Sequence, residues 1–459
     1  MRAMPLLAGA ALAFLLAGCA SVDPAPARRA VEADVSARLD RPIAWEQGGP
    51  DDRRADAAFS RLLAGPLTAD AAVEVALLHN PGLRAAFEEI GVSQADLVQA
   101  GLLRNPVFFA SARFPDRPPL AGDIELAVTQ DFLDLLMKPL QKRMASLELA
   151  ETKARVGHEA LQLAADVRAA SARYQARLQQ LRRVRLAAET LEAAGDLAAA
   201  QEKAGTLSEL DAALRAAAGQ QAAAETAEAE IDAARDREAL NRLMGLEPER
   251  TGWTMAETLP PLPPTDPPVT ALEARALRER LDLEAAGLRV ALLEKALSLK
   301  KGTALLPAGV NVGVDSERNP DGSRVTGPTL ELQLPLFDQG QASVARLEAL
   351  LRQAEDRRER LRVDAASAVR EAWTAMRAKR RLAETYRRTL LPQREKILRL
   401  SQAQYNYMLK SPYDLLEARR AEAETERRAL ELERDYWIER ARLQAAVGGG
   451  LNPTPKARS

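Results

Sequence analysis

The chain has 459 residues, with 64 lysines and arginines against 65 aspartates and glutamates, so its formal net charge is −1. This balance argues against a nucleic-acid partner, because binding to phosphates needs a clustered basic surface. Aromatic residues make up 4% of the chain, which is too few for a conventional large globular core. The abundance of Ala, Leu, Arg and Glu is typical of long packed helices.

The first residues have the pattern of a secretory signal. Arg2 supplies a positive charge, and an apolar run follows over 6–16. The run ends in Leu16-Ala17-Gly18-Cys19. Small residues before a cysteine are the pattern of a bacterial lipobox, in which the cysteine thiol is acylated and becomes the mature N-terminus. Cys19 is the only cysteine of the chain, so it cannot form an intramolecular disulfide. An ordinary signal peptide followed by an incidental cysteine is the alternative.

We therefore expect residues 1–18 to be a lipoprotein signal peptide and 19–65 to be a lipid-anchored linker. Ala20 stands where an aspartate would indicate the inner membrane, so it points to the outer membrane. The rest of the sequence contains no run near the roughly 18 apolar residues that a transmembrane helix requires. If the protein crosses a membrane, we expect a closed barrel, because open sheet edges cannot be satisfied in lipid.

Beyond the linker, the chain contains an internal repeat. Four segments match in the same order: Asn80–Ala86 with Arg280–Ala286, Leu126–Asp134 with Leu330–Asp338, Ser208–Asp211 with Ser411–Asp414, and Leu240–Gly245 with Leu443–Gly448. The last three pairs have an offset of 203 or 204 residues. Each match is weak alone, but four at nearly one offset indicate a duplication. We place repeat 1 at 66–250, a Pro-rich connector at 251–269, repeat 2 at 270–450 and a C-terminal tail at 451–459.

The two repeats are predicted to have the same order of elements, from apolar periodicity and turn residues. Repeat 1 has a helix over about 68–104, strands over about 106–114 and 123–132, and helices over about 138–202 and 207–245. Repeat 2 has a helix over about 270–301, strands over about 307–315 and 328–336, and helices over about 339–408 and 412–447. Some 65 residues of helix would extend on the order of 100 Å.

The alternation of apolar and polar residues is clearest in the second strand pair. Val310, Val312, Val314, Leu330, Leu332, Leu334 and Leu336 lie on one predicted face, and Asn311, Gly313, Asp315, Glu331 and Gln333 on the other, with Glu125 and Thr129 in the first pair. Strands of roughly ten residues fit a membrane barrel, but four cannot close one, since the smallest use about eight. A trimer would supply twelve. The alternative is a soluble sheet whose apolar face packs on helices.

These features resemble the TolC-like outer-membrane efflux proteins, particularly their lipoprotein branch, over about 66–450. The resemblance rests on Asn80-Pro81, the segment LPLFDQGQ at 334–341, two helix-turn-helix tips and the repeat. It implies a mainly α-helical fold with membrane β-structure, in which two repeats of coiled-coil hairpins and β-hairpins form a homotrimer with a twelve-stranded barrel and an α-helical periplasmic tunnel. The chain departs from the family at Leu281, where proline is usual, and at Met408, where glycine is usual.

The resemblance also implies the function of a passive duct in a tripartite efflux system. The expected partners are two further copies, a periplasmic adaptor, an inner-membrane pump and outer-membrane lipid through the acylated Cys19. We expect no enzymatic activity and no cofactor. The substrate is open, so heavy-metal efflux and type I protein secretion remain alternatives. From other classes, a periplasmic adaptor or a structural coiled-coil lipoprotein remains possible, although adaptors normally carry one hairpin and this chain has two.

The tips carry the candidate functional residues. By resemblance, a periplasmic gate is expected at Asp211, Tyr405, Lys410, Asp414 and Glu417, and adaptor contacts at Gly205, Leu207, Leu210, Ser411, Pro412 and Tyr413. Independently, Asp414 and Glu417 lie three residues apart on one helix face, and three-fold symmetry would turn each into a carboxylate ring that attracts cations. Lys410 could pair with Asp211 or Asp414 and hold the closed state. The alternatives are solvated surface charges for the gate, and leucines that only pack the turn.

Metal and catalytic sites are not predicted. The two histidines, His79 and His158, have no second histidine, cysteine or spaced carboxylates of the kind that transition metals prefer. The sequence also has no phosphate-binding glycine loop, no GxSxG and no HExxH.

Overall fold

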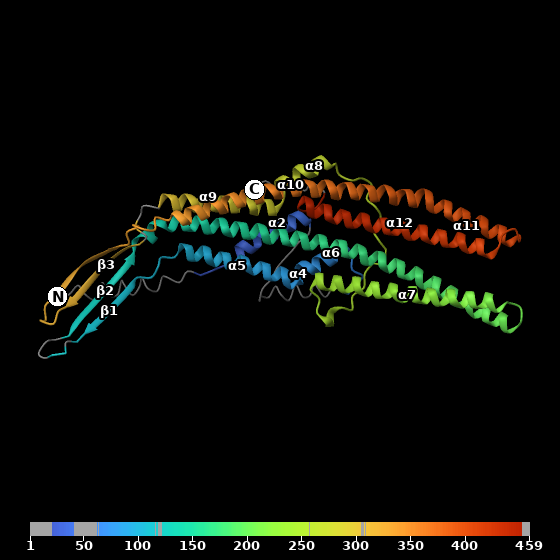
Figure 1. Cartoon of the computed structure of the whole chain (residues 1–459), viewed down its shortest axis with the longest axis horizontal. Helices are drawn as coiled ribbons and strands as arrows, with labels where there is room; N and C mark the ends of the chain where they lie inside the picture. The colour runs from blue at the N-terminus through green and yellow to red at the C-terminus, as the bar shows by residue number, and fades with distance from the viewer. Residues whose placement is uncertain are drawn as a thin grey trace. The chain divides into compact units, whose positions relative to one another are not determined.

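The computed structural model describes residues 21–40, 62, 64–114, 116–117, 122–256, 258–303, 307 and 309–451, with the side chains of Pro412 and Tyr413 left out (Figure 1). The predicted signal peptide and Cys19 lie outside these residues. The chain divides into two compact units. Unit 1 comprises Met1–Ala30, Ala86–Arg155 and Asp282–Leu361, and unit 2 comprises Val31–Ala85, Val156–Leu281 and Arg362–Ser459.

The elements of the two repeats follow each other in the same order. Repeat 1 contains α4 (Ala69–His79), α5 (Pro81–Gly101), β1 (Val107–Arg113), β2 (Asp123–Asp131), α6 (Phe132–Lys203) and α7 (Glu209–Met244). Repeat 2 contains α8 (Val269–Glu279), α9 (Leu281–Gly302), β3 (Val310–Arg318), β4 (Arg324–Leu332), α10 (Gln341–Thr385), a π-helix (Tyr386–Leu390), α11 (Leu391–Asn406) and α12 (Pro412–Val447). Among the described segments, none of the helices is long and apolar enough to span a membrane.

The first helix of each repeat is broken, so the predicted single helices over 68–104 and 270–301 are wrong. Asn80 is extended, with φ −62° and ψ 118°, because the ring of Pro81 disfavours helical backbone in the residue before it. The Asn80 Oδ1 atom then accepts a hydrogen bond from the Leu83 N–H at 2.9 Å and caps α5. Arg280 has nearly the same backbone, φ −68° and ψ 128°, although Leu281 follows it. There the Arg280 guanidinium donates to the Ala446 carbonyl at 3.1 Å.

The helix predicted over 339–408 is also interrupted. The π-helix Tyr386–Leu390 separates α10 from α11, and the Leu391 N–H donates to the Tyr386 carbonyl. The physical reason is Pro392, which has no N–H and whose ring would clash with a carbonyl in the preceding turn of a regular helix. A wider turn before the proline removes this clash, and π-turns of this kind occur frequently at functional sites.

A further helix, α2 (Ala25–Leu39), lies within the segment that the sequence predicted only as a linker. It ends against the C-termini of two other helices in unit 2. The Arg38 guanidinium donates to the carbonyls of Glu279 at 2.6 Å and Gly448 at 3.3 Å, and Asp34 orients it from 2.8 Å. Carbonyls at helix C-termini lack partners within the helix and carry partial negative charge, so one partly buried guanidinium satisfies carbonyls at the ends of both α8 and α12. The Gly450 N–H donates back to the Arg38 carbonyl at 2.7 Å.

The sheet belongs to unit 1 and is antiparallel in the order β1-β2-β3-β4 (Figure 1). Pairing of β2 with β3 joins the strands of the two repeats, with Val128 opposite Val314 and Thr129 opposite Gly313. A Cβ atom at Gly313 would lie 2.4 Å from the Val128 carbonyl oxygen, so a side chain at this position would push the two strands apart. The absence of a side chain at Gly313 therefore permits the pairing of β2 with β3, which joins the two repeats.

The second strand pair is shifted from the prediction. Strands β3 and β4 extend to the turn at 319–323, where the Asn319 N–H donates to the Ser323 carbonyl at 2.9 Å. Strand β4 ends at Leu332, so Gln333, Leu334 and Leu336 lie after the strand and not on its faces. The Leu336 N–H donates to the Leu334 carbonyl instead, because Pro335 cannot donate a ladder hydrogen bond.

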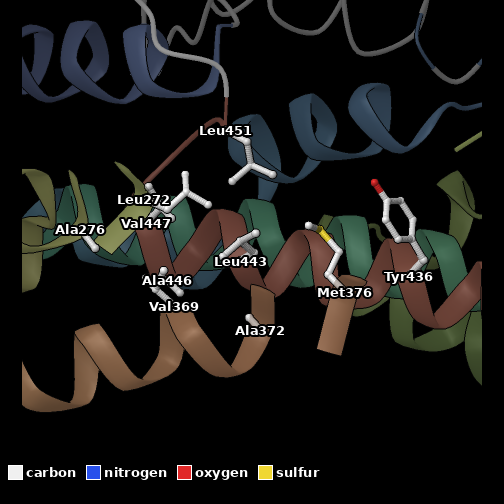
Figure 2. Close-up of a cluster of buried hydrophobic side chains, with 10 residues drawn as sticks. All are labelled: Leu272, Ala276, Val369, Ala372, Met376, Tyr436, Leu443, Ala446, Val447 and Leu451. Atoms are coloured by element: carbon white, nitrogen blue, oxygen red, sulfur yellow. The ribbon is translucent and has the colours of Figure 1, made fainter. Parts of the chain in front are cut away.

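The main buried cluster of unit 2 packs α8, α10 and α12 together (Figure 2). Its members are Leu272, Ala276, Val369, Ala372, Met376, Tyr436, Leu443, Ala446, Val447 and Leu451. Many are small, so helix axes can approach closely. The Tyr436 hydroxyl donates to Asp266 in the Pro-rich connector at 3.0 Å, and Arg380 pairs with the same carboxylate at 2.7 Å. Burial raises the pKa of Tyr436 to about 12, so the hydroxyl keeps its proton and remains a donor.

We expect Arg38→Ala to lower the free energy of unfolding by about 2 kcal/mol, because it removes charge-assisted hydrogen bonds from buried helix ends. Arg38→Lys should restore only part of the lost free energy, since an ammonium group lacks the several planar N–H donors of a guanidinium. The matched control is Arg29→Ala, an exposed arginine of the same helix, for which a change within about 0.5 kcal/mol is expected. Denaturant unfolding of the purified protein measures all three. Equal stability of the Arg38→Ala and Arg29→Ala variants would contradict the assignment.

Candidate functional site

The first tip connects α6 to α7 through a glycine turn. Gly205 has φ +70°, a conformation that glycine adopts without strain. The Gly205 and Thr206 N–H groups donate to the carbonyls of Glu202 and Gln201 at 2.8 and 2.9 Å, which closes the end of α6. Leu207 is half-buried in the turn, whereas Leu210 is 70% exposed. Of the two leucines, Leu210 is therefore the one available to a partner.

The second tip repeats this turn without the glycine. Met408 has φ +61°, and it and Leu409 donate their N–H groups to the carbonyls of Tyr405 and Gln404, both at 2.9 Å. The backbone is thus the same turn at an offset of 203 residues, and the departure from glycine at Met408 leaves the fold of the tip intact. The cost is local strain of about 1 kcal/mol, because a side chain in the left-handed region crowds the backbone.

The helix that follows each tip begins with a serine N-cap. Ser208 caps α7 and its hydroxyl donates to Asp211 at 2.6 Å. Ser411 caps α12 in a capping box, in which its hydroxyl and its N–H both donate to Asp414, at 2.7 and 3.0 Å. Two of the predicted gate carboxylates therefore have a structural role, which the sequence prediction missed. The signal that could have identified it is serine followed three residues later by an acidic residue.

The electrostatics of Asp414 follow from this cap. Its pKa lies below the ordinary value, first because of the hydrogen bonds from Ser411 and then because of the nearby charge of Lys410. The charge of Lys410 acts on the carboxylate through space. Asp414 is therefore fully charged at neutral pH.

The remaining gate candidates lie around the second tip. Tyr405 is near the end of α11 and is 38% exposed. Glu417 is exposed one turn after Asp414 on α12. The structure thus places Tyr405, Lys410, Asp414 and Glu417 on one tip, and Asp211 at the equivalent position of the other. Of the predicted contact residues, Ser411 is the N-cap and Pro412 begins α12. Position 413 falls in this first helical turn, and the side chains of Pro412 and Tyr413 lie outside the described structure.

The second tip also has a group of exposed apolar side chains that the sequence prediction did not name. They are Tyr407, Met408, Leu409 and Leu416, with 78%, 94%, 75% and 59% of their surface exposed. Contiguous exposed apolar residues of this size mark interaction surfaces. Their signal in the sequence was an apolar run within a turn, where polar residues are usual.

The sheet has two chemically different faces. Paired residues lie on the same face, so the register places Phe108, Leu126, Val128, Val312, Val314 and Leu330 together on one side. The exposed fractions of these side chains range from 44% for Leu126 to 66% for Phe108. Helices of this chain therefore do not cover the apolar face in the described structure, contrary to the alternative of a soluble sheet.

The opposite face carries the acidic side chains of the sheet, together with the apolar Val107, Phe109 and Val325. On this face Glu125 pairs with Glu317 across β2 and β3, and Asn311 lies between Asp131 and Glu331. Asp315 lies on the same face of β3. Arg113 balances part of the charge by contacting Glu125 at 3.0 Å and Asp123 at 3.6 Å. Asn311 donates to Glu331 at 3.2 Å. Within the residues described, no group of three or more His, Cys, Asp or Glu side chains is arranged to hold a metal ion.

Comparison with known proteins gives a family match for part of the sequence and a common fold for most of the chain. The family model of outer membrane efflux proteins matches residues 272–449. Comparison with curated protein sequences gives no match.

Solved structures resemble nearly the whole chain. The Campylobacter jejuni CmeC outer membrane channel has a TM-score of 0.71 at 16% identity, covering 90% of this chain and 91% of its own. The outer membrane protein VceC of Vibrio cholerae has a TM-score of 0.68 at 19% identity, with coverages of 84% and 97%. The Neisseria gonorrhoeae MtrE outer membrane channel, in its open state, has a TM-score of 0.63 at 18% identity, with coverages of 83% and 89%. Residues 272–449, which make up most of repeat 2, thus match the outer membrane efflux protein family, and the chain shares the fold of these solved outer membrane channels.

Proposed function

We propose that three copies of this protein form the outer-membrane channel of a tripartite efflux system, a passive duct for solutes delivered by a pump–adaptor complex. The observation that carries the proposal is the four-stranded sheet, which exposes its apolar side chains and has two outer strands, β1 and β4, each paired on one side only within it. Such a sheet is incomplete as a single copy.

The physics of the sheet edge supports three copies. In lipid, each unpaired N–H and C=O group costs several kcal/mol, so a spanning sheet must close on itself. Four strands are too few, because the smallest outer-membrane barrels use about eight. Three copies give twelve strands if β4 of one copy pairs with β1 of the next. The apolar face would then contact lipid, and the face with Glu125, Asp315 and Glu331 would line the water-filled interior.

The helical hairpins would continue the duct into the periplasm. Their tips carry the exposed Leu210 and the apolar group Tyr407, Met408, Leu409 and Leu416, which suit contacts with the helical tips of an adaptor. The carboxylates of Asp414 and Glu417 would form the periplasmic gate in three copies, with Tyr405, Lys410 and Asp211 around them.

We propose further that the channel is lipid-anchored through Cys19. Cys19→Ser should abolish metabolic labelling with a palmitate analogue, because the serine hydroxyl cannot replace the thiol as acyl acceptor. Ala20→Asp is the matched variant: it should keep the label but move the protein to the inner-membrane fraction. Labelling that persists in the Cys19→Ser variant would reject the anchor.

We expect the gate carboxylates to control cation block of the single-channel conductance in planar bilayers. Glu417→Gln keeps the capping box intact, so a loss of block in this variant reports charge and not folding, and the double variant with Asp414→Asn should lose more. Glu209→Gln, an exposed carboxylate in the first turn of α7, is the control and should leave block unchanged. Block that is the same in all variants would refute the carboxylate ring.

The pH dependence of this block follows from the lowered pKa of Asp414. A carboxylate with a depressed pKa keeps its charge until the pH falls below the ordinary value of 3.8, so the part of the cation block that remains in the Glu417→Gln variant and depends on Asp414 should persist to about pH 4 and disappear only below it. The same sign applies to the cap, whose contribution to stability is present above the ordinary pKa and is lost as the pH falls through the lowered one. Conductance recorded between pH 3 and 6 tests this, and loss of block near pH 5 would contradict it.

A further inference from the structure

The exposed side of α6 changes from apolar to basic along the first turns of the helix. Helix α6 begins directly after β2 ends at Asp131 (Figure 1). Over 132–143 the exposed side chains are Phe132, Leu135, Leu136, Pro139, Lys142 and Arg143. At about 3.6 residues per turn, these residues share one side of the helix. This side is therefore apolar next to the sheet and basic about three turns further on.

The charges on the other side of α6 are used within the chain. The Asp134 side chain is only 4% exposed, pairs with Lys138 at 3.0 Å and lies 3.8 Å from Arg104. These opposite charges compensate each other where they lie. Lys142 and Arg143 are on the exposed side of the helix, away from this network, so their positive charge can serve a partner outside the chain.

The second repeat has the same order of apolar and basic residues. At an offset of 204, Phe132 and Lys142 correspond to Leu336 and Arg346. Leu336 lies in the segment that joins β4 to α10, and Arg346 is exposed in the second turn of α10. The exposed apolar side chains of the joining segment are Leu334, Leu336 and Phe337, at 62%, 69% and 93%. Both repeats therefore carry the arrangement at the end of the sheet.

Lys300, at the end of α9, adds a further positive charge to the joining segment of repeat 2. Gly340 has φ +82°, and a Cβ there would lie 2.7 Å from the Lys300 Cε and 3.3 Å from its Nζ. The lysine stem can cross here only because Gly340 has no side chain. Lys301 differs, because it pairs with Glu348 at 2.6 Å. Basic residues in a last turn also complement the helix dipole, which is the simpler explanation for Lys300 taken alone.

The segments between the sheet and the helices have a surplus of positive charge. Residues 99–106, 132–143, 299–303 and 333–346 contain two acidic residues, Asp134 and Asp338. Their basic residues are Arg104, Lys138, Lys142, Arg143, Lys300, Lys301 and Arg346. The whole chain is balanced, with a net charge of −1. A local surplus in a balanced chain is complementary to a surface of negative charge.

The spacing of apolar and basic residues matches the depth of a phospholipid headgroup layer. A bilayer is about 40–45 Å thick, of which about 30 Å is hydrocarbon, so each headgroup layer is about 5–8 Å deep. Along α6, Leu136 and Lys142 are separated by about 9 Å. Lysine and arginine side chains extend along apolar surface and keep their charge in the polar layer. With the apolar side chains in hydrocarbon, the charged groups would therefore lie at the lipid phosphates.

We infer that these residues form an interfacial collar that binds anionic phospholipids. The apolar part of the collar consists of the exposed apolar side chains of 132–136 and 334–337, and its basic part of Lys142, Arg143, Lys300 and Arg346. The apolar part enters the hydrocarbon, and the basic part binds lipid phosphates and prefers lipids with a net negative charge. The inference rests on the proposed function because it requires the sheet to lie in a membrane. It adds a preference for lipid charge, which a closed barrel does not itself need.

Thermal unfolding of the purified full-length protein in neutral detergent micelles measures this preference. Phosphatidylglycerol and phosphatidylcholine with identical acyl chains are titrated separately, and a lipid that binds the folded protein raises the Tm. We expect phosphatidylglycerol to bind at least ten-fold more tightly, since each basic residue near an anionic lipid surface contributes a factor of about five. The combined variant Lys142→Gln, Arg143→Gln and Arg346→Gln should lose this difference.

The control variant combines Arg394→Gln, Lys396→Gln and Arg399→Gln, which removes three positive charges from exposed positions of α11. It should keep the preference for phosphatidylglycerol. Phe337→Ser changes the apolar part alone, so it should weaken the binding of both lipids and leave their ratio unchanged. Soluble glycerol phosphate should not raise the Tm, because it has no acyl chain for the apolar part.

Equal affinity of wild-type protein for the two lipids would overturn the collar, as would equal effects of the collar and control variants. Stabilisation by glycerol phosphate alone would indicate a site for free anions and reject the lipid. If a second copy covers this surface instead, the collar variant would weaken the oligomer in size-exclusion chromatography and keep the lipid preference.

Planar bilayers separate the collar from the proposed function. Wild-type channels that form without any lipid preference in the micelle titration would reject the collar and retain the channel. Wild-type protein that forms no channel would reject the proposed function, and the micelle titration would still decide the collar.

Discussion

The pairing of β2 with β3 is the constraint on which unit 1 depends. Strands from two repeats meet there, and their backbones can pair only because Gly313 has no side chain to contact the Val128 carbonyl. This register also separates the side chains of β3, because a slip of one residue would move Val312 and Val314 to the face that carries Glu125 and Glu331. The exposed apolar face, the two singly paired outer strands and the proposal of a closed assembly all follow from that pairing.

Sequence patterns predicted the repeat, the positions of the strand pairs and the ends of several helices, because these depend on local periodicity and turn residues. Helix α12 was predicted over 412–447 and has those bounds. The break at Arg280 could not be predicted in this way, since no proline follows it and its guanidinium contacts Ala446, which is distant in sequence. Helix α2 was missed for a similar reason: its C-terminal end is held by contacts with α8 and α12 and not by its own pattern.

The candidate site was predictable in its residue types but not in their local roles. Asp211 and Asp414 were selected as gate charges, and the structure makes each the partner of a serine N-cap. A carboxylate held by its cap has a fixed position, and the cap also lowers the pKa of Asp414; a charged ring would need both properties. Met408 gives the opposite lesson, since a residue that departs from the usual glycine still forms the same turn as Gly205.

The contact of Arg38 with Gly448 has a consequence for the order in which the chain folds. The two residues are 410 positions apart, and closing so long a loop costs more conformational entropy than any local step. Synthesis delivers α2 early and the end of α12 late, so α2 lacks this partner until almost the whole polypeptide has emerged. The contact of α2 with α12 can therefore form only after the chain has been synthesised almost to its end.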